Sequence, residues 1–288
     1  FIQQAKLSAS DAGFDLFGGS VAISGDTVVV GASWDAIGAN RIHGSAYVFV
    51  KPMGGWRSVT ETAKLTASDG SEFDEFGSSV AIDGDTVVVG APGDSSGGNP
   101  SQGSAYVFVK PVGGWRSMTE TAKLTASDGA ADDQFGSAVA IHEKTVVVGA
   151  VRGGIGVNFD QGSAYVFVKP AGSWRSMTET AKLTASDGAA FDNFGSSVAI
   201  DGDTVVVGAR ADEVSANTYQ GSAYVFGNTQ TPTYMPARTP TQRATTPTRP
   251  KPRRTRRDKP HADEEGLPHG NAFAHADGST SLCGRLQR

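Results

Sequence analysis

Pairs of aspartates recur along the chain at a spacing that could serve a divalent cation. Asp69 and Asp74 stand five residues apart in a Gly-containing segment, and the same spacing returns twice further along the chain. The candidate metal-binding residues are Asp69, Asp74, Asp128, Asp133, Asp187 and Asp192. Calcium takes about six to eight oxygen ligands, so backbone carbonyl oxygens would have to complete each site. Alternatively, these carboxylates cap turns by accepting backbone N–H bonds, and the protein needs no cofactor.

Four loops of eleven residues, at 33–43, 92–102, 151–161 and 210–220, carry a second set of candidates. They differ most between otherwise near-identical stretches of the chain. Binding residues often lie on loops above a rigid scaffold, and Trp, Tyr and Arg are favoured at interfaces. The candidate ligand-binding residues are Trp34, Asp35, Arg41, Asp94, Arg152, Phe159, Asp160, Arg210, Asp212 and Tyr219. The alternative is that these loop residues face solvent and differ between the copies because no function constrains them.

One residue is constant within these divergent loops. Asparagine occupies the same position in all four of them, at Asn40, Asn99, Asn158 and Asn217. A repeated contact to a ligand or metal is one interpretation. An asparagine that shapes the loop through an Asx turn or a left-handed backbone is the other.

Signatures of catalysis are scarce. His43 and His142 stand at non-equivalent positions, and neither has a second histidine at metal-ligand spacing. A carboxylate pair of the glycosidase type is compatible with the many aspartates. However, most of these aspartates recur at regular intervals, as structural residues would. The sequence therefore favours a protein that is not an enzyme, with a carbohydrate-active or other enzyme using loop carboxylates as the alternative.

The elements that must position these residues repeat every 59 residues. The repeated motifs are Phe-Gly, then VVVGA, then GSAYVF, always in this order. Phe-Gly stands at 17–18, 76–77, 135–136 and 194–195. Internal repeats of about 40–50 residues or more, with several strands each, are typical of propeller blades.

The second copy shows how one unit is expected to fold. Residues 62–67 alternate Ala63, Leu65 and Ala67 with polar residues, which indicates a half-buried strand. Asp83-Gly84 is a hairpin turn signal between two further strands, and the β-branched run after it indicates a strand buried on both faces. The recurring aromatics, such as Tyr106, Phe108 and Trp115, are expected to pack between blades. The prediction is an all-β propeller with four four-stranded blades.

The two ends of the repeat region complement one another. The segment FIQQAKLSAS at the start matches TETAKLTAS, the strand that follows GSAYVF and a tryptophan in the other copies. The last copy stops at GSAYVF without such a strand. Pairing these ends would remove exposed edges, either in a small ring of four blades or within a larger ring.

The order of motifs FG, SxVAI, GD, TVVVGA and GSAYVF resembles the FG-GAP repeat family, best known from the integrin α-subunit head. The second copy matches best, with Phe76-Gly77 and Gly90-Ala91-Pro92. The resemblance implies a β-propeller, usually of seven blades, at the cell surface or outside the cell, with a role in adhesion. Integrin-type repeats often carry a calcium loop in the hairpin, but here it is reduced to a tight turn such as Asp83-Gly84-Asp85.

Charge separates the repeats from the rest of the chain. Residues 1–226 carry a net charge of −11 and residues 227–288 carry +6, which sum to the −5 of the whole chain. An acidic body argues against binding of a nucleic-acid backbone by the repeats. The single cysteine, Cys283, excludes a disulfide within the chain.

Residues 1–226 are therefore expected to form the propeller, and residues 227–288 a disordered tail rich in Pro, Thr and Arg. No apolar run is long enough to predict a membrane span. The sequence starts at Phe1 without a signal peptide, so a targeting segment is expected to lie outside it. The predicted function is a binding or adhesion module at the cell surface or outside the cell, with a protein or glycan partner. A structural spacer within a larger surface protein is a further alternative.

Overall fold

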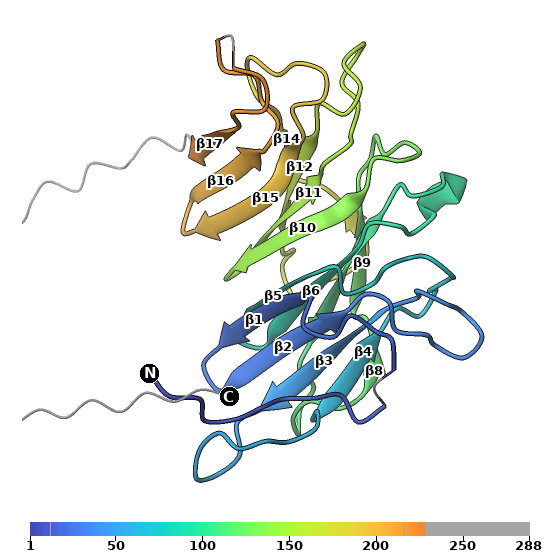
Figure 1. Ribbon diagram of the computed structural model, residues 1–288, viewed down its shortest axis with the longest axis vertical. Helices are drawn as coiled ribbons and strands as arrows, with labels where there is room; N and C mark the ends of the chain where they lie inside the picture. The colour runs from blue at the N-terminus through green and yellow to red at the C-terminus, as the bar shows by residue number, and fades with distance from the viewer. Residues whose placement is uncertain (12, 216, 228–288) are drawn as a thin grey trace, which may run out of the picture. The chain divides into compact units, whose positions relative to one another are not determined.

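The computed structural model describes residues 1–11, 13–215 and 217–227. Within these residues the chain forms β-strands and one short 3-10 helix, η1 (Ser96–Gly98). Figure 1 shows the strands gathered in four sheets that follow one another in chain order. The all-β fold with one blade per repeat is thus confirmed. The predicted tail, apart from Gly227, lies outside the described residues.

Each blade is an antiparallel sheet whose first three strands come from one repeat. The first blade contains β1 (Ser20–Ser24), β2 (Thr27–Ala32), β3 (Ser45–Val50) and β4 (Ala63–Thr66). The second contains β5 (Ser79–Asp83), β6 (Thr86–Ala91), β7 (Ser104–Val109) and β9 (Ala122–Thr125). The third contains β10 (Phe135–His142), β11 (Thr145–Ala150), β12 (Ser163–Val168) and β14 (Ala181–Leu183). The fourth contains β15 (Phe194–Asp201), β16 (Thr204–Ala209) and β17 (Ser222–Gly227).

The strands form where the sequence predicts them. In the second blade, Asp83 pairs with Thr86 across a two-residue turn, and Gly84 adopts a φ of 55°, which favours glycine. The three valines of β6, residues 87–89, are buried because blades pack on both faces of the strand. Ala63 and Leu65 of β4 are also buried, as the alternating pattern requires.

The outer strand of each blade belongs to the next repeat. Strand β4 pairs with β3, and β9 pairs with β7, so the chain crosses from blade to blade along these segments. Two strands that the sequence pattern did not predict, β8 (Met118–Thr119) and β13 (Met177–Thr178), pair in parallel with β4 and β9. Two residues are too few to show a period, which is why they were not expected.

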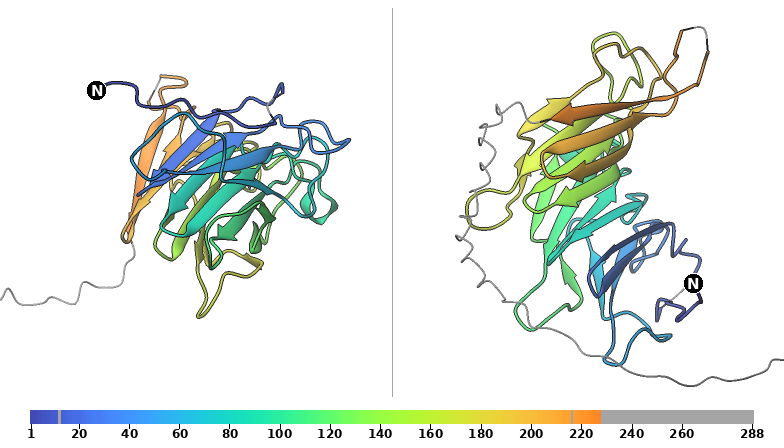
Figure 2. Two further views of the ribbon diagram at one scale, coloured as in Figure 1. Left: turned by 90° about the horizontal axis from the view of Figure 1, so that it is seen from below. Right: turned by 90° about the vertical axis from the view of Figure 1, so that its left-hand side faces the viewer.

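The two ends of the repeat region do not meet within the chain. The fourth blade has three strands, and among the described residues no strand pairs with the outer edge of β17. Residues 1–10, the N-terminal segment, lie instead along the first blade, where Leu7 forms a parallel bridge with Val59. Figures 1 and 2 show this segment and β17 at opposite ends of the row of sheets. The expected pairing of the two ends is therefore absent from this structure.

Apolar side chains fill the spaces between neighbouring blades. Between the first two blades, Phe76 packs against Tyr106 and Phe108 with ring centroids 5.4 and 5.9 Å apart. Val48 and Leu65 from the first blade cover this aromatic group, and all five side chains are fully buried. The same arrangement recurs at the next two blade contacts. The predicted packing role of Tyr106, Phe108 and Trp115 is confirmed.

Candidate functional site

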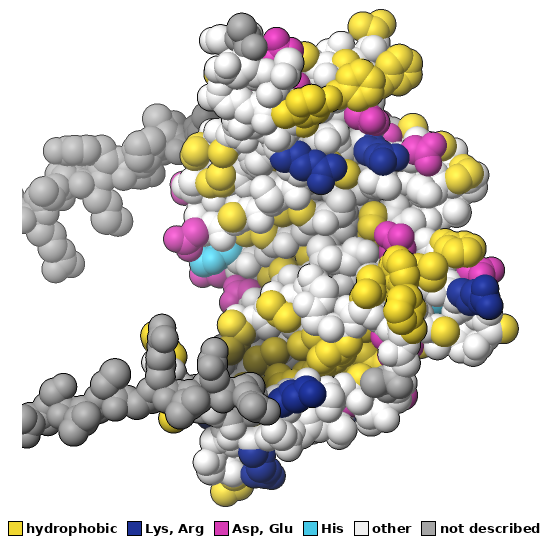
Figure 3. Space-filling view, viewed as in Figure 1, with side chains coloured by type: hydrophobic (Ala, Val, Ile, Leu, Met, Phe, Trp, Pro, Cys, Tyr) yellow, Lys and Arg dark blue, Asp and Glu magenta, His cyan; other side chains and the backbone are white. Residues whose placement is uncertain are grey.

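One edge of the sheets carries a continuous set of loops. The eleven-residue loops contact the segments that precede Phe-Gly in the next repeat. Backbone N–H groups make these contacts, from Phe73 to the carbonyl of Arg41 at 3.1 Å and from Phe191 to the carbonyl of Phe159 at 2.8 Å. Because successive blades are linked in this way, the loops form one surface, here called the loop rim. Figure 3 shows hydrophobic side chains gathered over it.

Aromatic side chains project from the loop rim into solvent. Trp34, Phe159 and Tyr219, which the sequence predicts as ligand contacts, are all exposed. Three further exposed aromatics were not predicted: Phe14, Phe73 and Phe191. They recur at intervals that are multiples of 59 residues, but this recurrence alone does not distinguish an exposed aromatic from one that packs between blades. The rim thus presents more aromatic surface than the divergent loops alone provide.

Two of these aromatics stand on unusual backbone. Phe73 and Phe191 both have a φ of 70°, a region that bulky side chains rarely adopt. Such conformations cost about 1–3 kcal/mol and concentrate at functional sites. The surrounding structure holds them: the N–H of each phenylalanine bonds to the loop of the preceding blade. Asp132 has the same conformation, with a φ of 66°, so this backbone belongs to the repeat, and it places Phe73 and Phe191 on the loop rim.

The first blade has a hollow on this rim. It encloses about 590 Å³ and is lined by Phe14, Trp34 and Arg41 together with carboxylates from Asp11 and Asp15. The rings of Phe14 and Trp34 lie 5.6 Å apart at an angle of 54°. An aromatic wall beside a guanidinium and carboxylates suits a ligand with a flat apolar face and polar edges.

The other predicted ligand residues divide into two groups. Arg152 and Arg210 are exposed on the rim, and Asp160 is partly exposed. Asp35, Asp94 and Asp212, which the sequence also predicts as ligand contacts, are buried. Their position directly after the buried VVVGA strand explains this, because the chain has not yet left the core when it reaches them.

The buried loop aspartates bind a lysine from the neighbouring strand. Nζ of Lys123 lies 2.7 Å from Asp94 and 2.6 Å from Asp69, and the hydroxyl of Tyr106 donates to Asp69 at 3.0 Å. Ser104 donates to Asp94 at 2.5 Å. Burial raises the pKa of Asp69, but the hydrogen bond and charge of Lys123 outweigh it, so this pKa lies below its usual value. We call this arrangement the lysine cluster.

The lysine cluster recurs with informative differences. In the first blade, Lys64 bonds Asp11 and Asp35 at 2.6 and 2.7 Å. In the third blade, Gly153 takes the place of the loop aspartate, and among the described residues Lys182 pairs only with Asp128. As a result, the hydroxyl of Ser163 is buried and finds no hydrogen-bond partner in the described part of the chain.

This gap predicts that Gly153→Asp stabilises the protein. The new carboxylate would accept a hydrogen bond from Ser163 and form an ion pair with Lys182. Asp94 makes the same two contacts in the second blade, with Ser104 and Lys123. We expect the free energy of unfolding to rise by about 1 kcal/mol, because a buried hydroxyl gains a charged partner. Urea unfolding measures it. The Gly154→Asp variant is the control, since Gly154 is the exposed neighbouring residue; equal effects of the two changes would contradict the prediction.

The second aspartate of each predicted metal pair caps a turn. Asp74, Asp133 and Asp192 are buried and accept backbone N–H groups, for example from Ala130 to Asp133 at 2.8 Å. Burial raises the pKa of Asp74 to about 6, and burial also raises the pKa of Asp133 and of Asp192. Within the described residues, no group of three or more His, Cys, Asp or Glu side chains is placed to hold a metal. Calcium binding stays a prediction for melting with and without chelator to test.

The repeated asparagines connect neighbouring blades. Nδ2 of Asn99 donates to Gln102 at 3.0 Å and to the carbonyl of Gly129 at 3.3 Å, and Asn158 makes the same bonds to Gln161 and Gly188. These contacts join an eleven-residue loop to the segment before Phe-Gly of the next repeat. The interpretation as a loop-shaping residue fits this geometry.

Stacked antiparallel sheets with one loop-bearing edge define a propeller-type repeat protein. The family model described as the FG-GAP repeat matches residues 1–49, 59–108, 118–167 and 177–226, so the chain belongs to the FG-GAP repeat family. FG-GAP repeats are found in adhesion-type and surface proteins. A crystal structure of the computationally designed protein Ika4 is similar over 78% of this chain and 99% of that one, with 18% identity and a TM-score of 0.43. No curated protein was found to match the chain.

Proposed function

We propose that this protein is a non-catalytic binding module that acts outside the cell or at its surface. The observation that carries the proposal is the row of exposed aromatics on the loop rim, held by backbone bonds between blades. Apolar side chains gathered on one exposed surface are typical of a binding site, because a partner that covers them removes apolar area from water. Membership of the FG-GAP repeat family supports the surface location.

The hollow of the first blade favours a glycan, or the glycan of a glycoprotein, as the ligand. Phe14 and Trp34 offer ring faces on which the apolar face of a sugar can lie, while Arg41 can bond its hydroxyls. The described residues contain no helix long and apolar enough to cross a membrane. The spacer alternative would leave these side chains without a role.

A carbohydrate-active enzyme is the second candidate, because Asp11, Asp15 and Asp35 line the same hollow. Lys64 already forms ion pairs with Asp11 and Asp35, so both carboxylates are engaged within the protein. Residues 93–97 also have the Gly-x-Ser-x-Gly spacing of hydrolase nucleophiles, but here a 3-10 helix of three residues follows instead of the helix that this motif requires. Release of reducing sugar from a polysaccharide panel would favour the enzyme.

Removing three aromatics from the loop rim is expected to abolish binding without unfolding the protein. We expect the variant Trp34→Ser/Phe159→Ser/Tyr219→Ser to bind at least about tenfold more weakly, because aromatic anchors dominate binding energy. A glycan array and a panel of immobilised glycoproteins, probed with the chain of residues 1–288, give the measurement. Melting temperature should stay within a few degrees because all three side chains are exposed.

The control variant is Met53→Ser/Val112→Ser. It removes two exposed apolar side chains from the segments that follow β3 and β7, at the other edge of the sheets. Binding of this control should equal that of the unmodified chain. If no probe binds the unmodified chain, or if both variants bind equally well, the proposed function is wrong.

A further inference from the structure

The fourth blade has a lysine cluster without its lysine. The hydroxyl of Tyr224 donates to Asp187 at 3.0 Å and to Asp212 at 3.1 Å, as expected from the other blades. The outer strand of each earlier blade supplies the lysine: Lys64, Lys123 and Lys182. Among the described residues, none supplies it here. The fourth blade thus presents two carboxylates in the geometry that holds a lysine ammonium elsewhere in the same molecule.

The same blade exposes backbone and apolar surface that the other blades cover. Among the described residues, no strand pairs with the outer edge of β17. Val225 of β17 is 70% exposed, whereas its equivalent Val107 is fully buried. An unpaired edge strand with an apolar face is a template for adding another strand.

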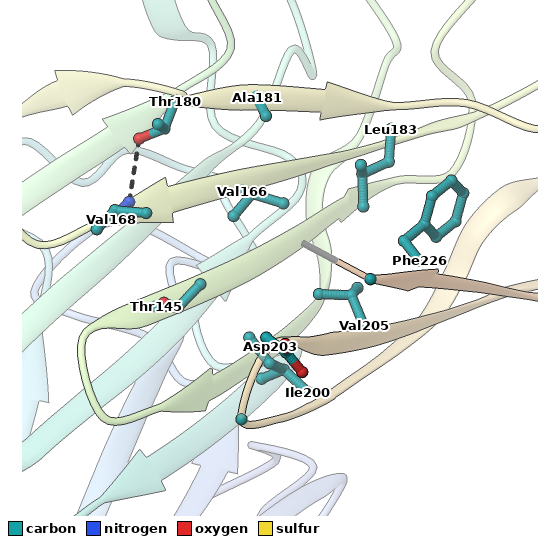
Figure 4. A pocket seen from close by; sticks show the side chains of 12 residues that line it. Thr145, Val166, Val168, Thr180, Ala181, Leu183, Ile200, Asp203, Val205 and Phe226 are labelled. Atoms are coloured by element: carbon teal, nitrogen blue, oxygen red, sulfur yellow. Dashed lines mark hydrogen bonds between the residues drawn. The ribbon is translucent and has the colours of Figure 1, made fainter. Parts of the chain in front are cut away.

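A groove beside β17 completes this acceptor surface. It encloses about 350 Å³ and runs between the third and fourth blades. Figure 4 shows Val166 and Leu183 facing Val205 and Phe226 across it. At the earlier blade contacts the corresponding space is filled by Trp115 with Met118, and by Trp174 with Met177. Those residues belong to the segment that leads into the outer strand.

The N-terminal segment has the features that this surface lacks. Ala5-Lys6-Leu7 corresponds to Ala122-Lys123-Leu124 of β9, and Phe1 stands at the position of Met118. The backbone N–H of Lys6 bonds to Ser58, as that of Lys123 does to Ser176, so the segment already has its strand-like placement. Its other edge is unpaired among the described residues.

The side chains of the N-terminal segment are also available. Phe1, Ile2 and Lys6 are exposed, and no described carboxylate lies within ion-pair distance of Lys6. Lys6 therefore differs from Lys64 and Lys123, which each bond two aspartates. Charge, strand pattern and apolar residues of the segment all match the fourth blade.

We propose that the N-terminal segment of a second copy of this chain adds to β17 as the fourth strand of the fourth blade. The register of the other blades places Leu7 opposite Ala223, Lys6 opposite Tyr224 and Ala5 opposite Val225. The ammonium of Lys6 then lies between Asp187 and Asp212. Phe1 pairs beside Leu183 and enters the groove, as Met118 pairs beside Leu65.

The occupant is a second copy because the segment of the same chain lies at the far end of the row of sheets (Figures 1 and 2). The first blade also exposes a matching apolar face: Ile23 is 65% exposed, whereas its equivalent Ile82 is 9% exposed against the preceding blade. The fourth blade of one copy meets the first blade of another, and such contacts between different surfaces can close into a ring. Two copies that each donate the N-terminal segment to the other form the smallest such ring.

Light scattering coupled to size exclusion tests the assembly. The full chain of 29.7 kDa is expected to elute with about twice that mass. Lys6→Glu places a third carboxylate beside Asp187 and Asp212, and we expect it to weaken association at least about 100-fold. The variant chain should remain folded because Lys6 is exposed. The control Lys51→Glu has the same charge change but removes only a surface ion pair with Asp26, so it should keep the assembly.

Hydrogen exchange of β17 gives a second measurement. Amides of β17 should exchange slowly in the unmodified assembly and rapidly in Lys6→Glu, whose circular dichroism should be unchanged. A monomer at all concentrations would overturn the proposal; slow exchange of β17 in that monomer would indicate that the chain pairs with its own N-terminal segment. An assembly that Lys6→Glu leaves intact would equally overturn it.

Discussion

Replacing Gly90 with alanine is expected to lower the free energy of unfolding by about 3 kcal/mol or more, because blades contact one another there through backbone. A Cβ on Gly90 would lie 2.0 Å from the carbonyl oxygen of Gly136 in the next blade. That oxygen also accepts a hydrogen bond from Ser79 at 2.8 Å, so it cannot move away without losing a contact between blades. Urea unfolding followed by circular dichroism measures the change.

The matched control is Gly154→Ala. Gly154 is exposed, and an added Cβ would approach only the carbonyl oxygen of Asn158, at 3.8 Å. We expect this change to shift the free energy of unfolding by less than about 0.5 kcal/mol, as is usual for surface positions. A Gly90→Ala variant as stable as the Gly154→Ala variant would mean that the blades can separate at this contact, which contradicts the close packing seen here.

The sequence predicts the architecture well because each blade repeats the same local pattern. The hairpin at Asp83-Gly84 and the alternation of Ala63 and Leu65 are short-range signals, and both appear in the structure as expected. The glycine of VVVGA recurs every 59 residues as well, but its role at the contact between blades, as for Gly90 against Gly136, follows only from the structure.

The candidate site was harder to predict, because its residues meet through contacts between repeats. Asp94 and Lys123 are 29 residues apart and come from different repeats, so spacing alone did not connect them. Asp94 therefore resembled an exposed loop residue. Phe73 and Phe191 were missed for another reason: their exposure and positive φ depend on the loop of the preceding blade, which bonds to their N–H groups. Local pattern identifies strands but not which polar residues share a pocket.

The lysine cluster explains how these blades tolerate buried charge. Asp94 is 5% exposed, and an unpaired carboxylate at such depth would be costly. Lys123 offsets this cost with two short contacts, and Ser104 and Tyr106 bond the carboxylates as well. Because the lysine comes from the strand that the next repeat supplies, the cluster forms only when successive repeats assemble. It thereby couples the fold of one blade to the placement of the next.

Replacing Lys123 with methionine is expected to lower the free energy of unfolding by about 3 kcal/mol at pH 7, because Asp94 is left buried without its cation. The loss should shrink as pH falls. The pKa of Asp69 lies below its usual value in the folded protein, so its stabilising contribution is present above the usual pKa and disappears as pH falls through the folded pKa. Acid thus removes this contribution from the unmodified protein, and the two proteins become closer in stability. Urea unfolding at pH 7 and at about pH 3, below the usual pKa of 3.8, measures both effects.

Lys182→Met is the control that the third blade supplies. Among the described residues Lys182 pairs with Asp128 alone, and Asp128 is half-exposed. Removing Lys182 therefore leaves no buried loop aspartate unpaired. We expect a loss of about 1 kcal/mol, typical of a partly exposed ion pair, together with a smaller dependence on pH. Equal losses in the two variants would show that Asp94 does not depend on Lys123, and the lysine cluster would then be a consequence of the fold instead of a cause of its stability.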